Sequence, residues 1–158
     1  MAAESDVEVF WQPDNISADM TPPAAFARYC QPFYDERAHA VAQPYVVHMD
    51  GRLKPIQAAV AASALDVVES FSLPQVGNDL TLAEAWAAWP DKVILPNFPA
   101  PLCRESSAGI TSFVEALLTQ VGAARPFMLQ FSEDIPTAEW SRVVPLVSEL
   151  FQRRTTPG

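Results

Sequence analysis

Short apolar runs alternate with amphipathic segments along the whole chain. The short runs are nearly continuous in hydrophobic residues, which is typical of β-strands that are covered on both faces. Prolines and polar residues separate them from the segments that follow. The predicted strands cover residues 7–11, 44–48, 66–71, 92–98 and 126–131.

The segments after these strands have apolar residues three or four positions apart, which predicts helices. We expect the first helix to run from Thr21 to about Val41, with a bend or break at Pro32 because proline has no backbone N–H. Thr81-Leu82-Ala83-Glu84 has the pattern of a capping box, in which the Thr and Glu side chains bind each other's backbone N–H. Further helices are expected at residues 53–64, 81–89, 110–121 and 140–151, the last interrupted by Pro145.

Five successive β-α units predict an α/β fold with parallel strands and right-handed crossovers, in a single domain over residues 1–158. Two architectures fit this order: an open doubly wound sheet, and a part of a (β/α)8 TIM barrel. Gln12-Pro13-Asp14-Asn15 follows the first strand where a nucleotide-binding doubly wound fold has a glycine-rich loop. A dinucleotide-binding function is therefore disfavoured.

The overall charge narrows the classes of partner. The 158 residues carry a net charge of −9 with only ten Lys and Arg, which argues against binding nucleic acid. The apolar runs are far shorter than the roughly 18 residues that span a bilayer, so no membrane segment is expected. The start MAAESDVEVF has no signal-peptide pattern, and two distant cysteines, Cys30 and Cys103, predict free thiols in a reducing compartment, by default the cytoplasm.

Polar side chains follow every predicted strand. In parallel α/β folds the carboxyl ends of the strands form the ligand site, so these residues predict one shared ligand face. Glu69 is the most informative, because a carboxylate inside an apolar run needs a partner. The candidates are Asp14, Asn15, His48, Asp50, Glu69, Asn97, Glu133 and Asp134.

Simpler interpretations exist for several candidates. A single histidine after an apolar run is more often a partly buried, satisfied side chain than a ligand. Asp50 precedes Gly51 and is equally consistent with a turn. Glu133 and Asp134 before Pro136 are equally consistent with a solvated loop and a helix start.

The ordered set of motifs resembles the C-terminal part of the uroporphyrinogen decarboxylase superfamily, which includes cobalamin-linked methyltransferases. The similarity spans roughly residues 9–151. Its N-terminal motifs are Asp14-Asn15-Ile16, Met20-Thr21-Pro22, Phe26, Tyr29 and Pro32-Phe33-Tyr34, followed by VVHMDGRLKPI, DVVESFSLP, GNDLTLAEAWAAWPDKVILPNFP and FSEDIPTAEW.

Members of this superfamily are (β/α)8 barrels, so the resemblance implies a partial barrel of about the last five βα units. A five-stranded part would leave two unpaired edges and an uncovered inner face. Self-association, or binding of a complementing N-terminal half, is therefore expected.

The resemblance also implies a metal site. The methyltransferases hold zinc with His-x-Cys after a strand and a distant Cys, and the zinc activates a thiol. Here the corresponding positions read His48-x-Asp50, with Glu69 and Glu133 further on, so carboxylates replace both cysteines. These four residues would hold Zn²⁺ or another divalent metal, or form a metal-free polar pocket. Asp14, Asn15 and Asn97 would orient a small-molecule substrate, and Asp134 would support a ligand.

The function implied is methyl transfer to a thiol or hydroxyl in one-carbon or corrinoid metabolism, with a corrinoid protein as partner. Porphyrinogen decarboxylation, a lyase reaction of porphyrin biosynthesis, is an alternative, but QFSEDIP stands where that branch has a glycine- and histidine-rich stretch. The sequence is also consistent with a non-catalytic barrel fragment that acts as an interaction subunit, and with a free-standing flavodoxin-like domain.

Overall fold

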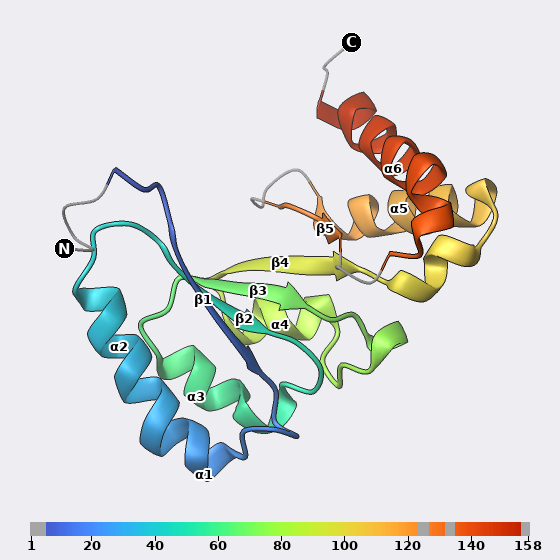
Figure 1. Ribbon diagram of the computed structural model, residues 1–158. Helices are drawn as coiled ribbons and strands as arrows, with labels where there is room; N and C mark the ends of the chain where they lie inside the picture. The colour runs from blue at the N-terminus through green and yellow to red at the C-terminus, as the bar shows by residue number, and fades with distance from the viewer. Residues whose placement is uncertain (1–5, 123–126, 132–134, 156–158) are drawn as a thin grey trace.

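A computed structural model describes residues 6–122, 127–131 and 135–155 (Figure 1). The protein is α/β, and its five strands form one parallel sheet in the order β1-β2-β3-β4-β5. Each strand thus pairs with the strand that follows it in the sequence. The strands are β1 (Phe10–Ile16), β2 (Tyr45–Met49), β3 (Val67–Phe71), β4 (Val93–Phe98) and β5 (Gln130–Phe131).

This sequential order separates the two architectures that the sequence leaves open. An open doubly wound sheet reverses its strand order at a switch point, where its ligand binds. No such reversal occurs among the described strands. The described part of the chain therefore does not have the strand order of a flavodoxin-like domain.

The first and last strands differ most from the prediction, and β1 ends at Ile16 instead of Trp11, so that Gln12–Asn15 lie inside the strand. β1 begins at Phe10 instead of Val7, because the N–H of Phe10 makes the first ladder bond, to Pro44 O at 3.0 Å, and its neighbour β2 starts only there. β5 is reduced to Gln130 and Phe131, since only these residues pair with Asn97 and Phe98 of β4. Residue 126, where the prediction began this strand, lies outside the described residues.

Helices follow each of the five strands, in several cases through short 3-10 turns. The first predicted helix is continuous from Pro23 to His39. A π-helical turn, Phe26–Cys30, ends two residues before Pro32, where proline has no N–H to donate. The helical elements are α1 (Pro23–Ala25), η2 (Phe26–Cys30), α2 (Gln31–His39), η3 (Lys54–Ile56), α3 (Gln57–Ala62), η4 (Pro74–Val76), α4 (Leu82–Ala88), η5 (Ala100–Arg104), α5 (Ser107–Val121), η6 (Thr137–Glu139) and α6 (Trp140–Thr155).

Capping side chains begin two of the helices, and a glycine ends one of them. The predicted capping box is present: Glu84 N–H donates to Thr81 Oγ1 at 3.2 Å, and Thr81 N–H donates to Glu84 Oε2 at 2.8 Å. Ser106 caps α5 with a single bond, in which its hydroxyl accepts from Gly109 N–H. Gly122 ends α5 with φ +66°, a left-handed value that suits glycine.

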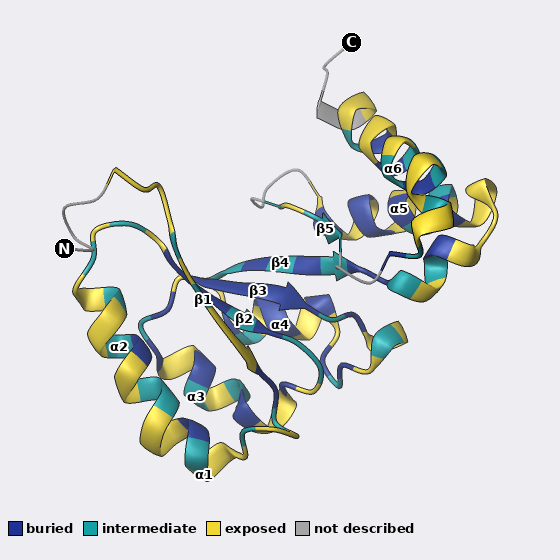
Figure 2. Cartoon of the chain, viewed as in Figure 1, coloured by how far each residue is buried: buried dark blue, intermediate teal, exposed yellow. Residues whose placement is uncertain are grey.

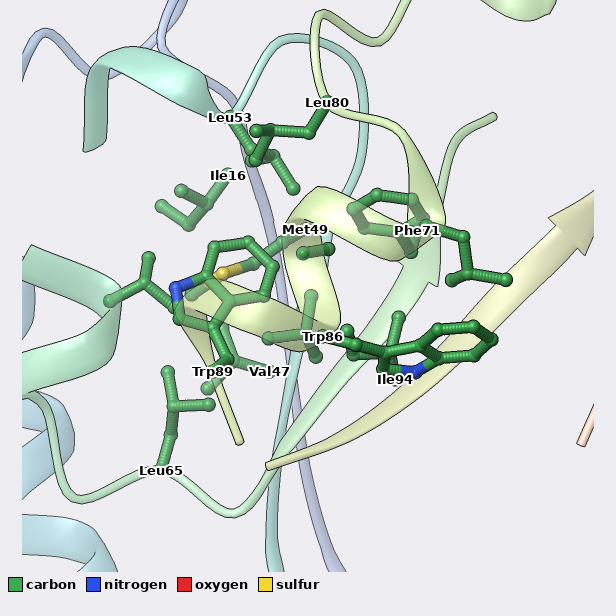
Figure 3. Packing of buried hydrophobic residues seen from close by; sticks show 14 of the residues in the cluster. Ile16, Val47, Met49, Leu53, Leu65, Phe71, Leu80, Trp86, Trp89 and Ile94 are labelled. Atoms are coloured by element: carbon green, nitrogen blue, oxygen red, sulfur yellow. The ribbon is translucent and has the colours of Figure 1, made fainter. Parts of the chain in front are cut away.

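The main hydrophobic core lies between one face of the sheet and the helices α2, α3 and α4 (Figure 3). A second cluster joins Phe98 and Cys103 to α5 and α6. Within the described ranges, no helix is both long and apolar enough to cross a bilayer. Strand residues of the main core include Val47, Met49, Val68, Phe71 and Ile94, and its helix residues include Tyr34, Val60, Ala85 and Trp86.

The opposite face of the sheet is open. Its residues belong to neither core cluster and line a hollow of about 470 Å³. Figure 2 shows β1, at the edge of this face, as largely exposed, and Trp11 and Met128 are 56% and 59% exposed. We call this surface the open face; it consists of Val9, Trp11, Val46, Val67, Glu69, Val93, Leu95, Met128 and Gln130.

Candidate functional site

A pocket of about 600 Å³ lies at the carboxyl end of the parallel sheet. All five strands or the residues just after them contribute to it, as expected where parallel strands end together. Five residues predicted from the sequence share this cavity: Asn15, His48, Asp50, Glu69 and Asn97. The lining residues are Trp11, Pro13, Asn15, His48, Asp50, Glu69, Ser70, Asn97, Gln130 and Phe131.

Two irregularities in the sheet shape this pocket. In β3, Ser70 is an extra residue between Glu69 and Phe71, which pair with consecutive residues of β4, and it has φ +63°. In β1 the register with β2 slips between Gln12 and Ile16, and Asn15 has φ +53°. Bulges bend a strand and redirect its side chains, and they are frequent next to ligand sites. Here each bulge places a polar residue in the pocket lining.

His48 and Glu69 form the centre of the site. They are paired residues on neighbouring strands, so both side chains stand on the same face, and His48 Nδ1 lies 2.7 Å from Glu69 Oε2. The same carboxylate oxygen accepts the indole N–H of Trp11 at 3.0 Å. The buried carboxylate that the sequence marks as needing a partner thus has two donors.

This arrangement fixes the chemistry of the histidine. A carboxylate is an acceptor, so the neutral imidazole carries its proton on Nδ1, and its lone pair is on Nε2. Nε2 makes no hydrogen bond within the part of the chain that the structure describes. His48 can therefore accept a proton from a ligand in the pocket while Glu69 stabilises the charge that forms.

Asp50 and Asn15 form a second polar pair on the pocket wall. With its amide nitrogen facing the carboxylate, Asn15 donates to Asp50 Oδ1 at 2.9 Å and to Oδ2 at 3.1 Å. Gly51 follows with φ +65°, so the turn that the sequence allows here is present as well. Asp50 both precedes a turn and lines the cavity.

Asn97 is held by the bulge in β3. Its amide nitrogen donates to Ser70 Oγ at 2.5 Å and lies 3.5 Å from Ser70 O. Its Oδ1 is buried and has no hydrogen-bond partner among the residues that the structure describes. An unsatisfied buried acceptor costs about 1–3 kcal/mol, so the site holds a group that a hydrogen-bond donor would stabilise.

Three predicted site residues do not join the described pocket. Asp14 faces α2, where Tyr34 Oη donates to its Oδ2 at 2.8 Å, and burial together with this contact raises the pKa of Tyr34 well above its ordinary value. The expectation that Asp14 orients substrate is not supported by this placement, because successive residues of β1 face opposite sides of the sheet and Asp14 alternates with the pocket residues Pro13 and Asn15. Glu133 and Asp134 lie outside the described residues.

The described residues alone do not form a metal centre. No group of three or more His, Cys, Asp or Glu side chains among them is arranged to hold an ion. The donor set explains this: Glu69 is bonded to His48 and Trp11, and Asp50 is bonded to Asn15. Glu133, the fourth expected ligand, is not described, so the metal site stays a prediction.

Trp11 and Ser70 are among the pocket residues that were not candidates from the sequence. Trp11 ends an apolar run and gives no polar signal, although indole N–H groups usually bind an acceptor when they are covered. Ser70 reaches the pocket because its backbone is left-handed, with φ +63°. Serine rarely adopts this conformation, so the sequence does not predict it.

The lining is acidic and rich in hydrogen-bond acceptors. Asp50 and Glu69 are its carboxylates, and neither lysine nor arginine occurs among the described lining residues. Its function must be inferred from this geometry. Comparison with protein-family models, with curated proteins and with solved structures finds no match.

Proposed function

We propose that the chain forms five units of a uroporphyrinogen decarboxylase-like (β/α)8 barrel, and that its pocket activates a thiol or hydroxyl of a small substrate for methyl transfer. The sequential strand order supports the barrel, because successive strands of a TIM barrel are neighbours. Helices cover one face of the strands while the opposite face is open, as in an incomplete barrel. The pocket at the strands' carboxyl ends is where such barrels hold their active sites.

The single observation that carries the chemistry is the His48–Glu69 pair. The substrate S–H or O–H gives its proton to His48 Nε2, and the resulting anion attacks an electrophilic methyl group. The S–C or O–C bond forms as the bond between methyl and its carrier breaks, and the electron pair stays on the carrier. The resemblance points to a methylated corrinoid on a partner protein as that carrier. Glu69 is a positioning residue, which stabilises the imidazolium through Nδ1–H.

A divalent metal such as Zn²⁺ is compatible with the same pocket if Glu133 joins it. His48, Asp50 and Glu133 would then hold the ion, with Glu69 orienting the imidazole as carboxylates commonly do. The ion would supply a Lewis acid that lowers the pKa of a bound thiol. Metal analysis of protein purified without added metal, beside His48→Ala, tests this: equal metal content in the two proteins rules it out.

S-methylation of a simple thiol tests the proposed chemistry without knowledge of the natural donor. Mercaptoethanol and iodomethane serve as substrate and methyl donor, and the S-methyl product is quantified. General-base catalysis typically contributes about 10²–10⁴-fold, so the wild type should exceed the background rate and His48→Gln should lose the excess. His39→Gln is the matched control, because His39 is the other histidine and is exposed. Equal rates for His48→Gln and the wild type would refute the proposal.

A second candidate is a non-catalytic interaction subunit, which the open face favours. Its apolar strand residues are of the kind that protein partners cover. This candidate predicts partner binding that survives His48→Gln and no methylation above background. Porphyrinogen decarboxylation matches the pocket poorly, since a polycarboxylate substrate needs cations that the described lining lacks.

A further inference from the structure

The unused hydrogen-bonding capacity of the pocket consists largely of acceptors. His48 Nε2 is free to accept within the described residues, and Asp50 accepts from Asn15 alone among them. Asn97 Oδ1 has no partner in this part of the chain. A ligand that complements these three groups must be rich in donors.

Three of the pocket's side-chain donors are already engaged. The Trp11 N–H is bonded to Glu69, and the Asn97 amide nitrogen is bonded to Ser70. Asn15 donates to Asp50. An anionic ligand, which needs donors, would find these three occupied, with the Gln130 amide and the Ser70 hydroxyl remaining.

The cations nearest to Asp50 in sequence are also engaged elsewhere. Arg52 forms ion pairs with Asp19 at 3.1 Å and Asp79 at 3.3 Å, and Lys54 pairs with Glu84 at 3.4 Å. None of these groups lines the pocket. The charge of Asp50 is therefore not offset by a described lysine or arginine.

Aromatic rings complete the wall. Trp11 and Phe131 line the pocket, and Trp11 is 56% exposed although its N–H is bonded. Aromatic faces attract cations, tryptophan most strongly. The carboxylate, the free acceptors and the accessible indole thus all favour a cationic ligand that donates hydrogen bonds.

We propose that the substrate carries a primary ammonium group beside its thiol or hydroxyl, so that it is a small amino thiol or amino alcohol. Asp50 binds the ammonium, and the nucleophilic end reaches His48 Nε2. The inference rests on the proposed function for the identity of the nucleophile. The preference for a cation rests on the charges and hydrogen bonds of the pocket.

Three thiols that differ in one terminal group test this: cysteamine has an ammonium, mercaptoethanol a hydroxyl and mercaptopropionate a carboxylate. Their binding is followed by the ¹H–¹⁵N signal of the Trp11 indole, assigned with Trp11→Phe. At neutral pH the wild type should bind cysteamine about tenfold or more tightly than mercaptoethanol, and mercaptopropionate most weakly. Equal affinities, a preference for mercaptopropionate, or no signal change with cysteamine up to about 50 mM would overturn the inference.

Asp50→Asn removes the charge and keeps the shape of the side chain, so it should lose most of the cysteamine preference. Glu115→Gln makes the same charge change on an exposed position of α5 and should keep it. Loss of the preference in both variants would contradict a local role for Asp50. The order of affinities in the wild type does not depend on proton transfer. If the wild type binds the three thiols in the expected order but His48→Gln still methylates at the wild-type rate, the proposed function is refuted. The preference for a cationic ligand is then still supported.

Discussion

Glu69 Oε2 lies 2.7 Å from His48 Nδ1, and the two residues are direct partners in the register of β2 and β3. Parallel pairing therefore places an acid and an imidazole side by side, although 21 positions separate them in the sequence. The Glu69 carboxylate is almost completely buried, with 6% of the residue exposed. Its position in the sheet serves to orient the imidazole.

Glu69→Gln should lower the rate of S-methylation by about 10–100-fold, the usual cost of losing a group that orients a histidine. The amide oxygen can still accept from both His48 and Trp11, but it carries no negative charge that would stabilise the imidazolium. Trp11→Phe keeps an aromatic ring and removes only one donor, so its loss should be smaller. A rate in Glu69→Gln equal to that of the wild type, in a folded protein, would remove Glu69 from the mechanism.

Ser70 should tolerate glycine better than alanine. Both changes remove the hydroxyl that binds Asn97, but only glycine adopts φ +63° without steric strain. We expect Ser70→Ala to be less stable than Ser70→Gly by about 1 kcal/mol in urea unfolding. The reverse order would show that Ser70 does not hold a left-handed conformation in solution.

Asp79 should stabilise the fold in a pH-dependent way. Partial burial alone would raise its pKa, but the N–H groups of Lys54 and Leu53 and the Arg52 side chain outweigh this and hold the pKa of Asp79 below its ordinary value. A lowered pKa in the folded state gives stability that is present above the unfolded value of about 4 and is lost as the pH falls through the folded value.

Asp79→Ala should therefore lower the free energy of unfolding by about 1–2 kcal/mol at neutral pH, as loss of a cap does. The difference between variant and wild type should narrow as the pH falls towards 3 or so, because the unfolded chain then gains a proton at Asp79 that the folded protein resists. Urea unfolding at both pH values measures this. A difference that is the same at both would mean that the charge of Asp79 does not contribute.

The open face should drive association of the isolated chain. Met128 is 59% exposed on this face, so Met128→Gln should weaken association measured by sedimentation velocity. Met20→Gln is the matched control, since Met20 is 78% exposed and is not part of the open face. A monomeric wild type, or equal weakening by both changes, would contradict this role.

The order and type of the elements could be predicted from hydrophobic spacing. The prediction of five parallel strands is confirmed, and so is the capping box at Thr81. Glu69 could be recognised as a residue in need of a partner because a carboxylate inside an apolar strand is costly. That the partner is His48 depends on the register between two strands, which no local pattern encodes.

The length of β1 explains why the prediction misplaced one site residue. Asp14 and Asn15 are neighbours at the end of β1, and the prediction gave both the same role. In the structure β1 continues to Ile16, and successive residues of a strand face opposite sides of the sheet, so Asp14 reaches Tyr34 and Asn15 reaches Asp50. The prediction ended this strand at Trp11 and therefore could not apply this alternation to the two residues.

The protonation of His48, with and without a thiol, tests the central claim most directly. The chain has two histidines, so His48→Gln assigns the ¹⁵N ring signals unambiguously. We predict that the neutral ring carries its proton on Nδ1 in the free protein, and that a saturating thiol adds a proton at Nε2 as thiolate forms. A proton on Nε2 in the free neutral ring, or no change at Nε2 when the thiol binds, would contradict the account.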